Sequence, residues 1–195
     1  MRRNAALVIV WTLALIEAGC NSSPSRFYTL SAAAAPSNAQ SKLSVSVGPV
    51  SVPAAIDRPQ IVVTTTANQV TIDDFNRWAS PVQDDLARVI AENLVAILGT
   101  PRVTLFPQTL NSDVDYRVQI GVRNFESVPG QSASLDAVWT VRRTKDGKSE
   151  TGRTSAREKV DDASFDAIAA AHSRGVARLS QDIADAVRTL DRAAP

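Results

Sequence analysis

Residues 114–123 read VDYRVQIGVR and residues 133–142 read ASLDAVWTVR. In both stretches every second residue is apolar and most residues between are polar, which is the pattern of a β-strand with one buried face. Asp146-Gly147 follows the second stretch and is typical of a hairpin turn, so we expect residues 149–160 to return as an antiparallel strand. This third strand is polar on both faces, which suits a sheet edge or a partner-facing position.

Further strand signals come earlier in the chain. Residues 43–47 alternate apolar residues with serines until Gly48-Pro49 breaks the pattern. Residues 61–66 are β-branched at every position, which strongly favours a strand. A short turn then leads into residues 70–72, so a second hairpin is predicted here.

Two amphipathic helices complete the pattern. Ser80, Pro81 and Gln83 form a capping box that predicts a helix with Ser80 as its N-cap, and Gly99 is placed to end it. A longer helix is predicted to begin near Ser164, because apolar residues then recur at steps of three and four. The stripe consists of Phe165, Ile168, His172, Val176, Leu179, Ile183, Val187 and Leu190.

The order of these elements predicts the fold class. Strands, a helix, further strands and a final helix indicate an α/β protein in which a mixed β-sheet is packed by helices on at least one face. We expect a single domain with a long C-terminal amphipathic helix, since no internal repeat or second domain is visible. Asp84 and Asp85, in the first turn of the first helix, are explained by the helix dipole.

The first twenty residues have the composition of a bacterial secretion signal. Two arginines precede a mostly apolar run, residues 5–16, which is shorter than the ~20 residues of a membrane-spanning helix. Cys20, the single cysteine, follows small residues and resembles the lipobox cysteine of bacterial lipoproteins, although Glu17 replaces the usual leucine. We expect a signal peptide over residues 1–19 and acylation of Cys20 by diacylglycerol and palmitate. The alternatives are an ordinary exported protein with a stray thiol and a short N-terminal membrane anchor.

Residues 20–42 are predicted to form a lipidated N-terminus ahead of a folded domain at residues 43–195. Residues 27–30 are compatible with a short strand. Residues 31–41 have too little apolar bulk to offset their ordering entropy, so we expect a flexible segment. Asn21 replaces the aspartate that commonly marks inner-membrane retention in Gram-negative lipoproteins, which favours the outer membrane.

The charge balance argues against one class of partner. The chain has 21 basic and 20 acidic side chains, and loss of Arg2, Arg3 and Glu17 with the signal leaves 19 of each. Without a basic excess to neutralise phosphates, nucleic acid is not an expected partner. With a single cysteine, no intrachain disulfide is possible.

No constellation in the sequence points to catalysis or to a cofactor. The one histidine, His172, lies within an apolar helical stripe, which favours a partly buried structural histidine over a catalytic one. There is no His/Cys cluster for zinc, no Gly-rich phosphate loop and no G-x-S-x-G elbow. The acidic pairs Asp73-Asp74 and Asp161-Asp162 lack the spacing of a calcium loop. We therefore expect a non-enzyme with no metal and no cofactor.

Three runs occur in order: FYTL at 27–30, DRPQIV at 57–62 and RWASP at 77–81. Together they resemble the PqiC-type lipoproteins, the ABC-type transport auxiliary lipoproteins, over essentially the whole mature chain. The resemblance implies a lipoprotein anchored in the outer membrane on its periplasmic face. It would be a non-catalytic auxiliary subunit of an ABC transporter of the mammalian-cell-entry (MCE) type, which moves lipids between membranes and supports envelope integrity. It further implies docking on an MCE-domain tunnel protein, as a homo-oligomeric ring.

Within these runs, Arg58, Arg77 and Trp78 are candidate partner or subunit contacts, because arginine and tryptophan are favoured in binding hot spots. A tryptophan just before a helix is also a common packing anchor, and both interpretations stay open. Two other functions remain alternatives: an outer-membrane lipoprotein that regulates a cell-wall synthase, and a soluble-domain lipid carrier. The carrier is less favoured, because five Phe, two Tyr and three Trp provide few bulky aromatic side chains.

Overall fold

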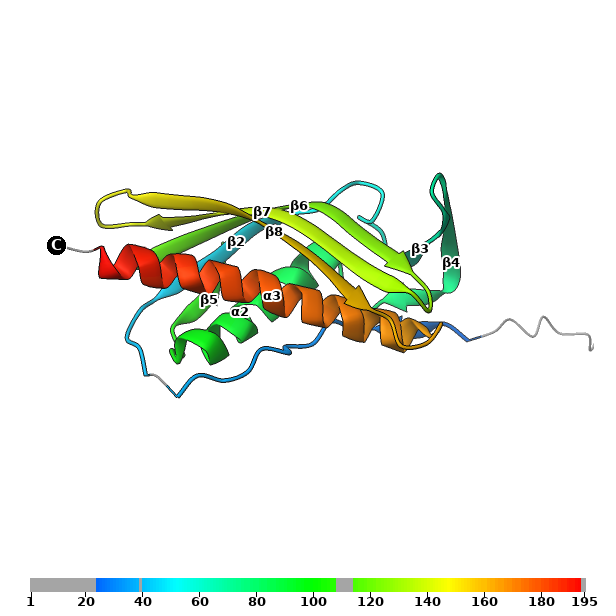
Figure 1. The fold of residues 1–195 in the computed structure, drawn as a ribbon, viewed down its shortest axis with the longest axis horizontal. Helices are drawn as coiled ribbons and strands as arrows, with labels where there is room; N and C mark the ends of the chain where they lie inside the picture. Colours follow the sequence, from blue (N-terminus) through cyan, green and yellow to red (C-terminus); the bar gives the residue numbers. More distant parts are fainter. Residues whose placement is uncertain (1–23, 39, 108–113, 194–195) are drawn as a thin grey trace, which may run out of the picture.

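The strands of the protein form two sheets. The computed structural model describes residues 24–38, 40–107 and 114–193, and within them the chain forms eight strands and two helices (Figure 1). The elements are β1 (Arg26–Tyr28), β2 (Val45–Ser51), β3 (Gln60–Thr66), β4 (Gln69–Trp78), α2 (Val82–Leu98), β5 (Val103–Leu105), β6 (Tyr116–Val128), β7 (Ser132–Arg143), β8 (Ser149–Lys159) and α3 (Phe165–Arg192).

The larger sheet has the strand order β5-β2-β6-β7-β8. β2 runs parallel to β5 and β6, whereas β6, β7 and β8 are antiparallel neighbours, so this is the predicted mixed sheet. The hairpin at Asp146-Gly147 is confirmed, with Gly147 at φ 74°. β8 lies at the sheet edge, as its polar character predicted. β2 does not end at Gly48-Pro49 as expected but continues through it, with a shift in its register to β6.

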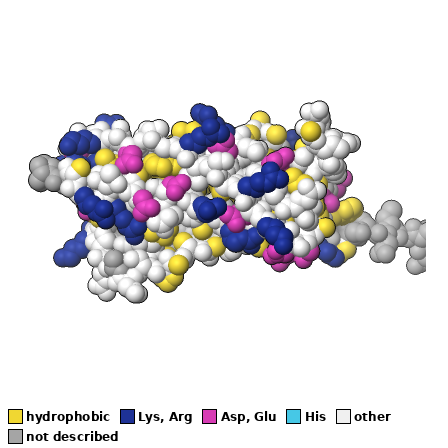
Figure 2. Space-filling model, in the orientation of Figure 1, with side chains coloured by type: hydrophobic (Ala, Val, Ile, Leu, Met, Phe, Trp, Pro, Cys, Tyr) yellow, Lys and Arg dark blue, Asp and Glu magenta, His cyan; other side chains and the backbone are white. Residues whose placement is uncertain are grey.

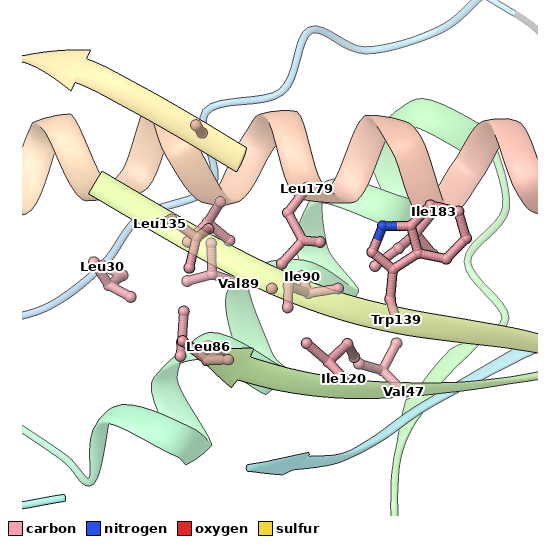
Figure 3. Close-up of a cluster of buried hydrophobic side chains, with 14 of the residues drawn as sticks. Leu30, Val47, Leu86, Val89, Ile90, Ile120, Leu135, Trp139, Leu179 and Ile183 are labelled. Atoms are coloured by element: carbon pink, nitrogen blue, oxygen red, sulfur yellow. The ribbon is translucent and has the colours of Figure 1, made fainter. Parts of the chain in front are cut away.

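Both helices cover the same face of the larger sheet (Figure 1). α3 packs on β7 and β8, and α2 lies beside α3 against β2 and β5. Inward side chains from these elements form one core, and in Figure 3 Leu135 and Trp139 of β7 meet Leu179 and Ile183 of α3. The predicted α/β fold, a single domain with a long C-terminal helix, is therefore confirmed. The opposite face carries exposed arginines: Arg117, Arg123, Arg142, Arg153 and Arg157.

The smaller sheet has the order β1-β4-β3 and was not predicted as a separate unit. β3 and β4 form the expected hairpin, and β1 adds to β4 in parallel. The division arises because residues 52–59, which include Pro53 and Pro59, carry the chain away from the larger sheet before β3 begins. Proline removes a ladder donor and fixes φ, so this stretch does not continue β2.

The start of α2 differs from the predicted capping box. The helix begins at Val82, and Pro81 is the N-cap residue with φ −50° and ψ 130°, without a side-chain cap. The backbone N–H groups of Asp84 and Asp85 both donate to the Pro81 carbonyl instead, at 3.0 and 3.1 Å. Ser80 as N-cap was therefore wrong by one residue. Gly99 ends the helix in the left-handed conformation at φ 65°, as predicted.

α3 has the side-chain cap that α2 lacks. The Ser164 hydroxyl accepts the Ala167 N–H at 3.1 Å. We expect Ser164→Ala to lower the free energy of unfolding by about 1 kcal/mol, the usual loss for an N-cap serine. Ser80→Ala is the matched control and should stay within about 0.5 kcal/mol of wild type. Urea unfolding followed by circular dichroism measures both, and equal losses in the two variants would contradict the assignment of the caps.

Hydrogen bonds join the segment before β2 to α2 and its C-cap. We call its described residues, 29–38 and 40–41, the N-terminal strap. The Ser37 N–H donates to the carbonyl of Ala96 at 2.9 Å, and the Ser41 N–H donates to that of Gly99 at 3.0 Å. In the described part of this segment, backbone N–H groups rather than apolar side chains make the contacts with the domain.

Neither described helix is long and apolar enough to cross a membrane. The predicted signal peptide, Glu17, Cys20 and Asn21 lie outside the described residues, so the structure does not test them.

Candidate functional site

The three sequence runs that resemble the PqiC-type lipoproteins meet at one corner of the molecule, beside the smaller sheet. The Trp78 N–H donates to the Pro59 carbonyl at 2.7 Å, which joins the second run to the third. The Ala79 N–H donates to the Tyr28 carbonyl at 2.8 Å and joins the first run to the third. Segments that lie 19 and 51 residues apart in the chain are therefore held together by backbone hydrogen bonds.

A pocket of about 250 Å³ opens at this corner. We call it the Arg58 pocket. Its lining comes from two of the three runs: Asp57, Arg58, Pro59, Trp78, Ala79, Ser80 and Pro81. Prolines, alanine and the indole make the lining mostly apolar, whereas Asp57 and Arg58 add charge at one side. This combination suits a protruding side chain or a short chain segment better than a whole lipid.

Arg58 is the polar group of this pocket with an unmet hydrogen bond. Its Nε is buried and has no partner among the described residues. Guanidinium nitrogens are donors only, so a buried Nε–H without an acceptor is destabilising. Because Arg58 as a whole is only partly buried, a rearrangement of its side chain could bring the Nε–H to a carboxylate, phosphate or carbonyl oxygen of a partner, which favours an acceptor-bearing partner at this site.

Trp78 and Arg77 take different positions. Trp78 is 6 % exposed, and its ring lies edge-on to Phe125 at 6.1 Å and to His172 at 6.5 Å between ring centroids. It is a packing anchor that presents one side to the pocket. Arg77 lies on the other face of β4, where its Nε donates to the Asp74 carbonyl at 2.9 Å. The structure thus brings Arg58 and Trp78 together and separates Arg77 from them.

Behind Trp78, His172 is buried in the core, more completely than the partly buried histidine that the sequence predicts. Its ring stacks on Phe125 with centroids 3.7 Å apart, and a hydrogen bond of 2.9 Å joins its Nε2 to the Ser127 hydroxyl. Its Nδ1 has no partner among the described residues. A serine–histidine contact alone does not make a nucleophile, because no carboxylate orients the ring and both side chains are almost inaccessible.

The burial of His172 predicts acid sensitivity. Desolvation lowers the pKa of His172 to about 3, whereas an unfolded histidine titrates near 6.5. Because only the unfolded chain takes up this proton, the stabilisation is complete above pH 6.5 and is lost toward pH 3, at about 1.4 kcal/mol per pH unit. Between pH 6.5 and pH 5, wild type should lose about 2 kcal/mol more than His172→Gln. Urea unfolding measures the two slopes, and parallel pH dependences would contradict a neutral buried ring.

Asp85 holds the start of the N-terminal strap, a role that sequence reasoning missed. This carboxylate is 4 % exposed and accepts the Leu30 N–H at 2.7 Å and the Thr29 hydroxyl at 3.1 Å. Arg88 pairs with it at 2.5 Å and donates to the Leu30 carbonyl at 2.7 Å. The hydrogen bond to Asp85 raises the pKa of Arg88. Interpreting Asp85 only as a partner of the helix dipole was therefore incomplete.

Asn93 holds the next part of the strap. It is fully buried, and its Oδ1 accepts the N–H groups of Ala33 and Ala34 at 3.1 and 3.0 Å. Its Nδ2 donates to the Ser180 hydroxyl of α3 at 3.3 Å. In the sequence, the only sign of this role is that a polar residue, Asn93, lies next to the apolar stripe of α2. The sequence does not show which segment's backbone groups Asn93 would bind.

The described ranges contain no cluster of three or more His, Cys, Asp or Glu side chains that could hold a metal ion. The Arg58 pocket at the corner is an apolar recess with a guanidinium at its side, an arrangement that suits recognition of another molecule.

A family model described as the ABC-type transport auxiliary lipoprotein component matches residues 28–184. The chain belongs to this family. The resemblance to PqiC-type lipoproteins is thereby confirmed, and the matched region contains all of β2 to α2, including the Arg58 pocket. As a member of this family, the protein is an auxiliary lipoprotein component of ABC-type transport.

Solved structures agree on the fold. A crystal structure described only as an uncharacterized protein has a TM-score of 0.70 and 21% identity, covering 85% of this chain and 99% of its own. The crystal structure of protein XCC0632 from Xanthomonas campestris, of family DUF330, has a TM-score of 0.64 and 20% identity, covering 86% and 99%. No curated protein matches the chain.

Proposed function

We propose that this protein is anchored in the outer membrane through acylated Cys20 and faces the periplasm. There it serves as a non-enzymatic auxiliary subunit of an ABC transporter of the MCE type, which moves lipids between membranes and supports envelope integrity. Its partner is the MCE-domain tunnel protein, which it meets as a homo-oligomeric ring.

One observation carries the proposal: the sequence runs that resemble the family converge on the Arg58 pocket. The runs DRPQIV and RWASP line the pocket, and the run FYTL is hydrogen-bonded to the same corner through Tyr28. The buried Nε of Arg58 has no hydrogen-bond acceptor among the described residues. A surface with an apolar recess and an unmet donor supports docking of another protein that supplies an acceptor, for which arginine is a common hot-spot residue.

The polar groups elsewhere support a scaffold rather than a catalyst. Asp85 and Asn93 are buried and bind backbone groups of the N-terminal strap, and His172 of α3 is buried against Phe125 and Trp78. These side chains stabilise the domain and do not face a substrate-sized cavity. A pocket of about 250 Å³ is also small for a whole phospholipid, which weighs against the carrier alternative.

Crosslinking in intact envelopes tests the function. Full-length tagged protein is expressed in its own host, crosslinked and purified, and the captured proteins and the mass of residue Cys20 are determined by mass spectrometry. We expect an acylated cysteine and an MCE-domain protein as the main partner. Arg58→Glu should reduce capture of that partner about tenfold or more, since reversing a hot-spot charge commonly costs over 1.4 kcal/mol.

Arg142→Glu is the matched control, because Arg142 is an exposed arginine near the C-terminal end of β7, at the end of the molecule opposite the smaller sheet (Figure 1). It should capture the MCE-domain protein like wild type. A peptidoglycan synthase as the main partner would support the cell-wall alternative and contradict the proposal. An unmodified Cys20 in a freely soluble product would contradict the anchor.

A further inference from the structure

The smaller sheet has one face turned toward the core and one turned away. On β3, Ile61 and Val63 are buried, so the residues between them point outward. Paired residues of neighbouring strands share a face, and the outward residues of β3 pair with Arg77, Ile72 and Val70 of β4. Arg77 in turn pairs with Phe27 of β1. We call this surface the outer face: Phe27, Gln60, Val62, Thr64, Val70, Ile72 and Arg77.

The outer face exposes several large apolar side chains to solvent. Phe27 is 64% exposed, Val70 56% and Ile72 43%. Phe75, two residues before Arg77 on the same strand, is 45% exposed. These four account for most of the large apolar side chains that the described chain exposes. In Figure 2, hydrophobic atoms are visible at the end of the molecule near β1. Such clustering marks an interaction surface.

The position of this face relative to Cys20 indicates what covers it. β1 begins at Arg26, which is six residues from Cys20. Six residues span at most about 20 Å even when fully extended. An acyl anchor at Cys20 therefore keeps β1, and the end of β4 that pairs with it (residues 76–78), within about 20 Å of the membrane surface. Val70 lies six residues further along β4, about 20 Å beyond that end, so the anchor holds one end of the outer face near the bilayer.

The position and charge of the face favour contact with a lipid surface. Four half-exposed apolar side chains present on the order of 100 Å² each. The nearby cations Arg26 and Arg77 are balanced by Asp73 and Asp74 of β4. Attraction to anionic lipid is therefore weak, and apolar contact with the interfacial region of the bilayer remains.

We propose that the outer face of the smaller sheet docks on the bilayer that holds the anchor, with Phe27, Val70 and Ile72 inserted into its interfacial region. The inference rests on acylation of Cys20, which belongs to the proposed function. Docking fixes the orientation of the domain on the membrane, and it does not depend on salt or on anionic lipid.

Fluorescent labels on introduced cysteines test the docking. Because acylation occupies the Cys20 thiol, acylated full-length Val70→Cys carries a single reactive thiol for an NBD label. Val95→Cys is the matched control, since Val95 is an exposed valine on α2. Both proteins are reconstituted in phosphatidylcholine vesicles with and without brominated phosphatidylcholine. We expect bromolipid to quench the Val70 label at least threefold more than the Val95 label, equally at low and high salt.

Additional Phe27→Ser and Ile72→Ser changes should abolish most of that difference. Equal quenching of the two labels, in protein that floats with the vesicles, would overturn docking and leave the anchor intact. A Val70 label that is shielded in detergent without lipid would show a protein partner at this face and also overturn the inference. Protein that fails to float would contradict the anchor and, with it, the docking.

Discussion

Asp85→Ala is expected to lower the free energy of unfolding by about 2–3 kcal/mol, because the buried Leu30 N–H loses its charged acceptor. The same change removes the acceptor of the Thr29 hydroxyl and the ion-pair partner of Arg88, whose side chain is 40% exposed. The first part of the N-terminal strap should therefore detach from α2. Urea unfolding measures the stability, and amide hydrogen exchange at Leu30 measures the local opening.

Asp84→Ala is the matched control for this prediction. Asp84 is the neighbouring aspartate of the same helical turn, but it is exposed and makes no buried ion pair. It should change stability by no more than about 0.5 kcal/mol. Similar losses in the two variants would show that the helix dipole, and not the strap, explains the acidic pair.

Gly152→Ala is expected to lower the free energy of unfolding by about 3 kcal/mol and the Tm by about 10 °C. A Cβ at Gly152 would lie 2.5 Å from Cη2 and 2.8 Å from Cε2 of Trp139, the residue that pairs with it across β7 and β8. Trp139 is buried and donates to the Thr154 hydroxyl at 3.0 Å, so the ring has little freedom to move. Thermal unfolding by circular dichroism measures the loss.

Gly121→Ala provides the comparison, since its added Cβ would meet the Ser51 hydroxyl at an ordinary 3.6 Å. That variant should be neutral or slightly stabilised, because alanine restricts the unfolded chain more than glycine does. If Gly152→Ala were equally neutral, the indole would have to adopt another rotamer, and the close packing of β8 on Trp139 would be wrong.

The sequence predicted a partner or subunit contact but no pocket, and only some of the residues chosen for that contact line the Arg58 pocket. Arg58 and Trp78 were chosen from the sequence, and the pocket contains both, but Arg77 alternates to the opposite face of β4. Neighbouring residues of a strand point to opposite sides, so a run such as RWASP does not mark a single surface. Trp78 also proved to be mainly a packing residue, since its ring is covered by Phe125 and His172.

The local pattern of the sequence was sufficient for the antiparallel strands β6, β7 and β8, and for the helix ends whose caps lie within a few residues. It did not reveal β5 or the continuation of β2 through Gly48-Pro49. Alternation over residues 114–123 and 133–142 determined two neighbouring strands, and the Ser164 hydroxyl lies three residues from the N–H that it caps. Gly99 and Gly147 adopt the left-handed conformations that their turns require. In each case the stabilising contact lies within a few residues or repeats with the period of the element.

Only the tertiary structure decided the attachment of the N-terminal strap and the assembly of the Arg58 pocket. Leu30 and Asp85 are 55 residues apart in the chain, and the strap is fixed by its backbone N–H groups, which every residue except proline carries. The sequence therefore gives no sign of which acceptor they will find. Side-chain periodicity selects the strands and helices. Hydrogen bonds between distant backbone groups and buried polar side chains determine where the N-terminal strap attaches and which segments meet at the Arg58 pocket.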